Sequence, residues 1–233
     1  MLADQELIEI HARVLYTYDG HSRIVSINEP GGGPPAPRMF LGRTRSGNVW
    51  RFRHDLPIKL ISELERLCAD EPLVSDLQEE PRHLSEYLRS LQAHDRVSGI
   101  GAGPAYCFAE YPEPTRSIYA LTEDDSSILS GGFEDCVAEL PDWQPFVAAI
   151  ESSQAVSICR SVRITKEVHE AGVETLPGYR GKGLAVDVTA HWARLVRAKG
   201  AIPLYSTSWE NTASQSVARK LGLRMFGTDL SIK

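Results

Sequence analysis

The C-terminal half of the chain alternates short apolar runs with two longer segments of helical periodicity. In residues 184–199 apolar side chains recur every four positions, which marks one face of a helix, and Gly200 follows as a helix stop. A second helix is predicted over 212–221, where Gly222 ends the pattern. Five apolar runs predict strands at 146–150, 155–162, 168–176, 201–207 and 223–232. The first three would form an antiparallel meander, with a helix beginning at Trp143–Phe146 as an alternative.

The N-terminal half has a different pattern. Pro and Gly are concentrated in residues 28–38, which excludes a helix or an interior strand there. Two short apolar runs at 39–44 and 48–53 flank a turn signal and predict a hairpin. Helical spacing follows in a segment that opens at Pro57 and in residues 83–93, and both helices are expected to pack against a sheet.

The glycine-rich segment Gly99–Pro104 separates the two patterns. No clear strand precedes it, so we interpret it as a linker, and the first strand of the second part is predicted at 106–111. The chain would then consist of an accessory N-terminal α+β region, residues 1–100, and a second domain, residues 101–233. Its mixture of strands and helices predicts the fold class α/β (α+β).

The amino-acid composition of the chain indicates which classes of binding partner are unfavourable. A net charge of −6 disfavours nucleic acid or an anionic membrane. The four cysteines lie far apart, so reduced core thiols are expected in place of a metal site or a disulfide framework. The N-terminus is acidic where a signal peptide would be basic, and no apolar run approaches the roughly 18 residues of a membrane span. A cytoplasmic protein is therefore expected.

The turn between the third strand of the meander and the following helix carries the candidate chemistry. It reads Pro-Gly-Tyr-Arg-Gly-Lys-Gly-Leu-Ala from 177 to 185. A helix N-terminus offers unpaired backbone N–H groups and a partial positive charge, which together bind phosphate oxygens. Gly181 and Gly183 leave room for a diphosphate, and Arg180 or Lys182 can add a charged donor. The pattern predicts a pyrophosphate-binding loop, with a simple tight turn as the alternative.

Two other phosphate loops are excluded by spacing. The Walker pattern GxxxxGK[ST] is absent, and Val186 stands where the dinucleotide fingerprint GxGxxG needs its third glycine. A different phosphate ligand is therefore predicted.

The sequence R-x-x-G-x-A that begins at Arg180 resembles the pyrophosphate loop Q/R-x-x-G-x-G/A of the GNAT superfamily, the acyl-CoA-dependent N-acetyltransferases. A second match lies at the expected separation in residues 209–223, where an Asn-led helix and a Gly-apolar exit follow a strand. The resemblance covers about 146–232 and extends less clearly to 101. It implies a central mixed, mostly antiparallel sheet flanked by helices.

The resemblance also implies how acetyl-CoA would be held. Val173, Glu174 and Thr175 would offer backbone hydrogen bonds to the pantetheine arm, as an added strand does. Asn211 would contact the cofactor from the other side of the split between two strands, unless it serves only as a helix cap. The remaining cofactor-binding residues would surround the diphosphate: Arg180, Gly181, Lys182, Gly183, Leu184, Ala185 and Val186.

Acetyl transfer to an amine needs an unprotonated nucleophile, a polarised thioester carbonyl and a proton for the leaving thiolate. A backbone N–H near residues 173–175 would bind the carbonyl. Glu174 and Glu170 are the candidate catalytic bases, because strand alternation places them on one face. His169 competes with them, because its ordinary pKa lies nearer neutrality.

The chain departs from the family pattern at the residue that would protonate the leaving thiolate. Many relatives place a tyrosine in the helix after the Asn to protonate the thiolate, and here that position is Ala218. The usual acidic position of the preceding strand is Ser206. Tyr205, Ser206 or Ser216 could substitute, or the thiolate could leave unaided, since a thiol has a pKa of about 8.5.

Three functions follow from these observations. The leading hypothesis is an N-acetyltransferase that moves an acetyl group from acetyl-CoA to a primary amine of a small molecule or a protein by direct attack on the thioester. The alternatives are a non-catalytic acyl-CoA-binding module and a loop that binds ATP or NAD and not CoA. No metal, nucleic acid or membrane partner is expected, and the exposed sheet edge of such folds often supports a homodimer.

Overall fold

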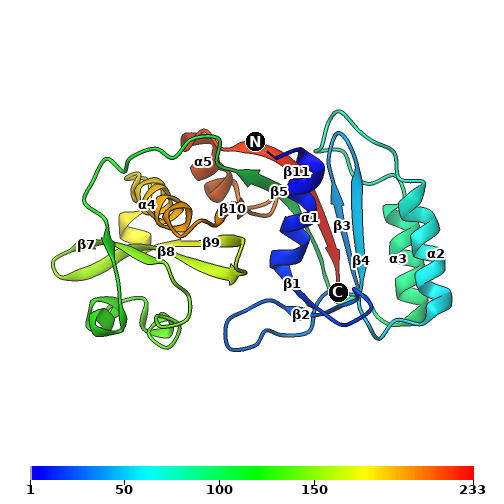
Figure 1. Cartoon of the computed structure of the whole chain (residues 1–233), viewed down its shortest axis with the longest axis horizontal. Coiled ribbons are helices and arrows are strands. Elements are labelled where there is room, and N and C mark those ends of the chain that lie inside the picture. Colours follow the sequence, from blue (N-terminus) through cyan, green and yellow to red (C-terminus); the bar gives the residue numbers. More distant parts are fainter. Residues whose placement is uncertain (1) are drawn as a thin grey trace.

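One mixed sheet of nine strands runs through residues 2–233, which the computed structural model describes (Figure 1). The strand order is β4-β3-β11-β5-β10-β9-β8-β7-β6, and every neighbouring pair is antiparallel except β9 with β10. The strands are β3 (Met39–Arg43), β4 (Asn48–Phe52), β5 (Ile100–Cys107), β6 (Tyr119–Ala120), β7 (Phe146–Glu151), β8 (Gln154–Ile164), β9 (Val168–Thr175), β10 (Ile202–Ser206) and β11 (Arg224–Ile232). The predicted mixed, mostly antiparallel sheet with flanking helices is confirmed.

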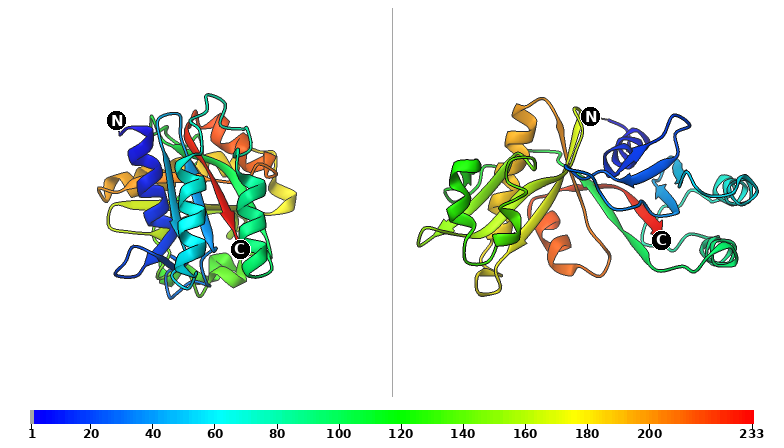
Figure 2. Two further views of the ribbon diagram at one scale, coloured as in Figure 1. Left: turned by 90° about the vertical axis from the view of Figure 1, so that its right-hand side faces the viewer. Right: turned by 90° about the horizontal axis from the view of Figure 1, so that it is seen from below.

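Helices cover both faces of this sheet (Figures 1 and 2). Along β3 the side chain of Phe40 joins the apolar cluster under α1, whereas Met39 and Leu41 join the cluster under α2 and α3, so these helices lie on opposite faces. α4 and α5 cover the strands at the other end of the sheet. The helices are α1 (Asp4–Leu15), α2 (Ile58–Ala69), α3 (Leu84–His94), α4 (Leu184–Ala198) and α5 (Thr212–Lys220).

Shorter elements complete the fold. A separate ribbon of β1 (Tyr16–Tyr18) and β2 (Ile24–Ile27) follows α1. The segment between β5 and β7 contains the 3₁₀ turns η1 (Glu123–Leu129) and η2 (Glu134–Cys136), which pack with β7 and β8 in one apolar cluster. A third turn, η3 (Pro177–Tyr179), leads from β9 toward α4.

Most predicted elements are confirmed within two residues. These are the hairpin at 39–53, both helices of the N-terminal half, and every strand and helix from residue 146 onward. The two N-terminal helices pack against the sheet as expected. The alternative of a helix at Trp143–Phe146 is wrong, because Phe146 begins β7.

The interpretation of Gly99–Pro104 as a linker is wrong. β5 begins at Ile100 and lies between β11 and β10, and only its last two residues belong to the strand predicted at 106–111. Gly103 explains the discrepancy, because a Cβ atom there would lie 1.8 Å from the carbonyl oxygen of Thr207. The glycines that weakened the strand signal let two backbones approach each other.

The first hundred residues share the sheet of the later ones. β3 pairs with β11 over five residues, from Met39 with Ile232 to Arg43 with Thr228. The N-terminal α+β region therefore extends one side of the sheet, and a domain boundary near residue 100 remains a prediction.

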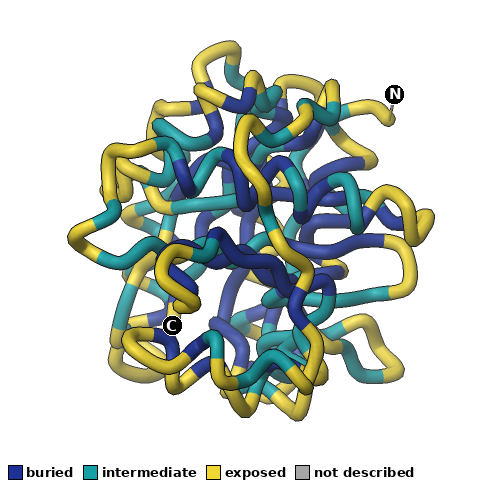
Figure 3. Tube along the Cα trace, turned by 90° about the vertical axis from the view of Figure 1, so that its left-hand side faces the viewer, coloured by how far each residue is buried: buried dark blue, intermediate teal, exposed yellow. Residues whose placement is uncertain are grey.

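α1 and the β1–β2 ribbon have no counterpart among the predicted elements. The signal for α1 is present in the sequence, because Leu7, Ile8, His11 and Val14 recur at helical spacing and are all buried. The tube in Figure 3 shows that buried segments run through the interior while exposed residues gather in the turns. None of the helices in residues 2–233 is long and apolar enough to cross a bilayer.

Candidate functional site

β9 and β10 pair for only three residues and then separate. The shared register joins Val168–Glu170 to Ile202–Leu204. Beyond it β9 continues to pair with β8, and β10 continues to pair with β5. The edge of β9 from Ala171 to Thr175 is therefore free of a neighbour on the β10 side, and its backbone groups are available to a ligand.

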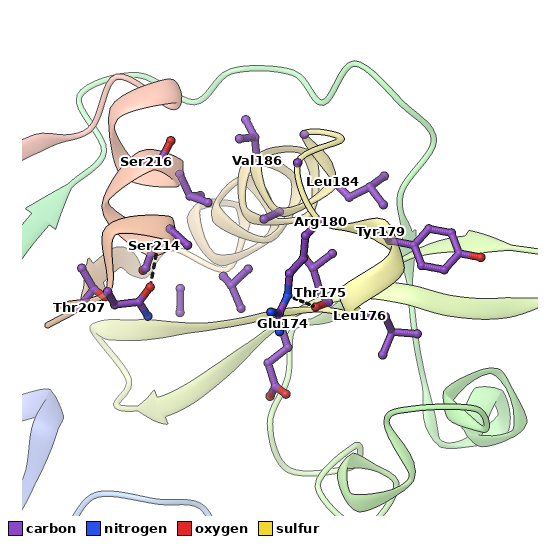
Figure 4. Close-up of a pocket in the computed structure, with 18 of the residues that line it drawn as sticks. Glu174, Thr175, Leu176, Tyr179, Arg180, Leu184, Val186, Thr207, Ser214 and Ser216 are labelled. Carbon is purple, nitrogen blue, oxygen red and sulfur yellow. Dashed lines mark hydrogen bonds between the residues drawn. The ribbon is translucent and has the colours of Figure 1, made fainter.

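A cavity of about 820 Å³ occupies this split (Figure 4). Both separated strands contribute to it, together with the loop before α4 and the first turns of α5. Gly132 and Phe133 close one end from the segment between β5 and β7. The residues of the two strands and α5 are Ala171, Val173, Glu174, Thr175, Tyr205, Ser206, Asn211, Ala213, Ser214, Ser216, Val217 and Lys220.

The loop at the N-terminus of α4 has the backbone conformation that the glycines allow. Gly181 has φ +76° and Gly183 has φ +85°, both in the left-handed region that favours glycine. No protein atom lies within 4 Å of the position a Gly181 Cβ would take. The loop therefore presents open space beside the positive end of a helix of 15 residues.

The two cations of the loop are partly engaged by the protein. Nε of Arg180 donates to the carbonyl oxygen of Thr175 at 3.2 Å, which holds the side chain over the end of β9 (Figure 4). Nζ of Lys182 lies 4.6 Å from the centre of the Tyr179 ring. Arg180 lines the cavity and Lys182 does not.

The structure brings the predicted cofactor-binding residues together. All of them except Lys182 line one cavity. They are Val173, Glu174, Thr175, Arg180, Gly181, Gly183, Leu184, Ala185, Val186 and Asn211. Asn211 is also the N-cap of α5, where its side chain accepts a hydrogen bond of 3.0 Å from the Ser214 amide. Gly132 and Phe133 also line the cavity, from a segment in which no site residue was predicted.

A family model described as GNAT acetyltransferase matches residues 146–228. Residues 146–228 are therefore similar to GNAT acetyltransferases. The match spans β7 to β11 and so includes the split strands and the α4 loop. No curated protein sequence matches the chain.

Several solved structures resemble this chain at low sequence identity. A GCN5-related N-acetyltransferase-like protein from Streptococcus suis superimposes with a TM-score of 0.51 at 15% identity, and 85% of each chain is covered. A GNAT-family acetyltransferase from Colwellia psychrerythraea gives 0.47 at 12% identity, over 79% of this chain and 75% of that one. A GNAT-family acetyltransferase from Novosphingobium aromaticivorans gives 0.46 at 18% identity, over 59% of this chain and 66% of that one. The Streptococcus protein shows that the fold is shared.

Glu174, one of the two candidate bases, belongs to the free edge of β9 and lines the cavity. Its side chain points away from α4, to the opposite face of β9 (Figure 4). There Oε1 accepts a hydrogen bond of 2.7 Å from Arg160, which also binds Glu139 at 2.9 Å and lies over the Trp143 ring. The Glu174 side chain is 52% exposed, so it remains accessible beside this ion pair.

Glu170, the other candidate base, lies at the vertex of the split and does not line the cavity. Its Oε1 is 2.7 Å from Nδ1 of His11, a close ion pair that is not well aligned as a hydrogen bond. Nε2 of the same imidazole is 2.9 Å from Asp229 on β11. Burial lowers the pKa of His11, but the two carboxylates outweigh burial and raise it to about 10. α1 is thus joined to the sheet through a charged histidine.

His169 lies on the α4 side of β9, and its pKa is shifted in the opposite direction to that of His11. Its Nδ1 lies 2.9 Å from Oγ of Ser161, which also accepts from the Trp192 indole at 3.0 Å. Burial, with a smaller contribution from Lys199, lowers the pKa of His169 to about 4. This histidine is neutral at pH 7, is buried, and does not line the cavity.

The candidate acidic hydroxyl groups all line the cavity. Tyr205, Ser206 and Ser216 line the cavity, and the Tyr205 hydroxyl lies 2.6 Å from Oγ of Ser214. Burial raises the pKa of Tyr205 to about 12, so the phenol carries its proton at pH 7. Ala218, where the resemblance predicts a tyrosine, is fully buried on the inner face of α5.

The four cysteines are buried and unpaired. Within the described part of the chain, no three His, Cys, Asp or Glu side chains are grouped so that they could hold a metal ion.

Proposed function

We propose that this protein is an N-acetyltransferase that transfers the acetyl group of acetyl-CoA to a primary amine by direct attack on the thioester. One observation carries the proposal: the glycine loop at the N-terminus of α4 opens into the same cavity as the free edge of β9. A diphosphate and an extended amide-bearing arm are the two groups that such neighbours recognise. Acetyl-CoA contains both in one molecule.

The residues present fit this ligand. The diphosphate would be bound by the backbone N–H groups from Gly181 to Val186, beside the Arg180 guanidinium. The pantetheine arm would pair with the edge of β9 at Val173 to Thr175, where no strand competes for the backbone groups. Asn211 would bound the ligand on the α5 side, where it lines the cavity.

The chemistry would take place where the strands separate. A backbone N–H of β9 would polarise the thioester carbonyl as a fixed dipole. The amine acceptor would approach from the face of β9 that carries Glu170 and Glu174, and one of them would take its proton. Glu174 is favoured because it borders the cavity and is half exposed, whereas Glu170 is enclosed by His11 and Asp229. Tyr205 would protonate the departing thiolate, since it borders the cavity as a neutral phenol.

An acyl-CoA-binding module without turnover is the second candidate. It is favoured by Ala218 and Ser206, which stand where relatives have groups able to exchange protons. Such a module would bind acetyl-CoA with the same affinity but release no thiol in the presence of amines. A loop for a different nucleotide would bind ATP or NAD and not CoA.

Calorimetric titration of the folded protein with acetyl-CoA tests the ligand. Gly181→Asn and Gly181→Asp form a matched pair, because both side chains tolerate a left-handed backbone and only Asp adds a negative charge beside the diphosphate. We expect the Asn variant to retain binding within a few-fold and the Asp variant to lose at least about tenfold, the effect of one unfavourable charged contact. Titrations with ATP and NAD should show no saturable binding. If the folded wild-type protein does not bind acetyl-CoA, the proposal is wrong.

Turnover is tested separately from binding. Thiol release from acetyl-CoA is followed with a panel of diamines, polyamines, amino acids and lysine-containing peptides. Amine-dependent release supports the transferase. Tight binding without release from any member of the panel supports the binding module instead.

A further inference from the structure

A segment outside the matched GNAT residues is fastened over the start of α4. The amide and Oγ1 of Thr115 donate to Oδ1 of Asp187 at 2.7 and 3.0 Å. Asp187 lies in the first turn of α4 and is buried. Farther along the helix Arg194 donates to the carbonyl oxygen of Tyr111 at 3.1 Å. The segment 111–116 therefore lies along α4 and ends at the glycine loop.

Arg116 is the residue that reaches this loop. Its Nη1 donates to Oδ2 of Asp187 at 2.5 Å, and a Cβ atom on Gly183 would lie 3.4 Å from the same nitrogen. The side chain is 49% exposed. Asp187 thus holds a solvent-accessible guanidinium against a loop that has no side chain of its own at that point.

The negative charge of CoA indicates what the Arg116 guanidinium could do beside Gly183. The diphosphate and the 3′-phosphate of CoA carry about four negative charges at neutral pH, because a phosphate monoester alone carries close to two. The loop contributes two cations: Arg180, which lines the cavity, and Lys182, which lies over Tyr179 and does not line it. A third cation adjacent to Gly183 would be stabilising for an anion bound there.

We propose that Arg116 is a phosphate-binding residue of the acyl-CoA site, which donates a charged hydrogen bond to a phosphate group of CoA at the Gly183 end of the loop. The proposal rests on the proposed function. Arg116 is not among the residues that line the cavity, so the contact would lie at its rim, beside Gly183. The two phosphate groups within reach of this chemistry, the diphosphate and the 3′-phosphate, are distinguished by experiment.

The competing role for Arg116 is to fasten the segment to α4. That role leaves the affinity for phosphates unaffected in the double variant Arg116→Gln/Asp187→Asn, which has no unpaired carboxylate beside the loop. The proposed contact predicts instead that this variant still binds CoA more weakly than the wild type. Arg194→Gln is a matched control, because Arg194 ties the same segment to α4 through Tyr111 and Glu113 and lies farther along the helix from the loop.

The test is calorimetric titration of wild type, Arg116→Gln, Arg116→Lys, the double variant and Arg194→Gln with CoA and with 3′-dephospho-CoA. We expect Arg116→Gln to weaken CoA binding about tenfold, the effect of one hydrogen bond between charged groups. Arg116→Lys should restore part of the affinity, and Arg194→Gln should bind CoA like the wild type. The salt dependence of CoA binding should also become shallower in Arg116→Gln.

Each pattern of results has one meaning. An equal loss for both ligands supports a contact with the diphosphate, and a loss confined to CoA supports a contact with the 3′-phosphate. Unchanged affinities in Arg116→Gln or in the double variant, or an equal loss in Arg194→Gln, would overturn the proposal while leaving the proposed function intact. Wild-type protein that binds neither ligand would reject the proposed function, and the role of Arg116 with it.

Discussion

Glu170 of β9 and Leu204 of β10 form the last pair in the register that these two strands share. Their backbones mark the vertex of the split, and the cavity begins one residue farther along each strand, at Ala171 and Tyr205. The Cα atom of Val173 is about 10 Å from that of Glu170 at 3.3 Å per residue of strand. A thioester held at Val173 would therefore lie between the two candidate carboxylates, Glu170 and Glu174.

Replacing Glu174 by Gln tests the proposed base. We expect kcat/KM at pH 7 to fall by about 10², the usual effect of a general base, while the Kd for acetyl-CoA is unchanged. The loss should diminish at alkaline pH, because the amine then loses its proton without help. Activity is measured as thiol release with the best acceptor from the amine panel.

Glu139→Gln is the control for this prediction, because Glu139 shares the partner Arg160 and does not line the cavity. It should retain near wild-type activity. Full activity in Glu174→Gln, together with a loss in a folded Glu170→Gln, would assign the base to Glu170.

Replacing Tyr205 by Phe tests the proposed acid. The variant keeps the buried ring and removes the hydroxyl that contacts Ser214. We expect kcat to fall about tenfold with little change in the Kd for acetyl-CoA, because the thiolate would then leave without a nearby proton donor. Ser216→Ala is the comparison, since it removes another cavity hydroxyl. An unchanged kcat in Tyr205→Phe would mean that the thiolate leaves unaided.

Replacing Gly103 by Ala tests the close approach that hid β5 from sequence analysis. The added Cβ would meet the Thr207 carbonyl oxygen, so the two backbones must move apart. We expect a loss of about 3 kcal/mol or more in the free energy of unfolding, at the upper end of overpacking effects. Gly99→Ala is the control, because no atom lies within 4 Å of its Cβ position. Equal stability of the two variants in urea titrations would contradict the account.

The position and conformation of the glycine loop before α4 were predictable because their signal is local. Two glycines with positive φ, a cation and the start of a helix lie within a few residues, and a short motif contains all of them. Strands β8 and β9 were also visible, because the turn segments 151–154 and 165–167 mark where they begin and end. β5 was missed because Gly103 makes room for the backbone of Thr207, about a hundred residues away in the sequence.

The surroundings of the candidate bases could not be predicted, since they depend on distant segments. His11 belongs to α1, and its two partners are Glu170 and Asp229. Arg116 reaches Gly183 from a segment without recognisable periodicity. Alternation along a strand predicts which side chains share a face, but not which helix or loop covers that face.

His11 should make the protein sensitive to alkaline pH. Its pKa is raised from 6.5 to about 10 in the folded state by Glu170 and Asp229, which outweigh burial. The stabilisation is therefore fully present below pH 6.5 and is lost as the pH rises toward 10. Urea unfolding between pH 6.5 and 10 should show a fall in stability that is absent in His11→Gln. The exposed His21 provides the control, and a similar fall in His11→Gln would contradict this assignment.

His169 should make the protein sensitive to acid pH. Its pKa falls from 6.5 in the unfolded chain to about 4 in the folded protein, because burial penalises the charged ring. The unfolded state then binds a proton that the folded state does not, so stability is complete above pH 6.5 and is lost as the pH falls toward 4. His169→Gln should flatten this acid limb of the urea-unfolding profile, whereas the exposed His54→Gln should leave it unchanged. An acid limb that is equally steep in His169→Gln would place the responsible group elsewhere.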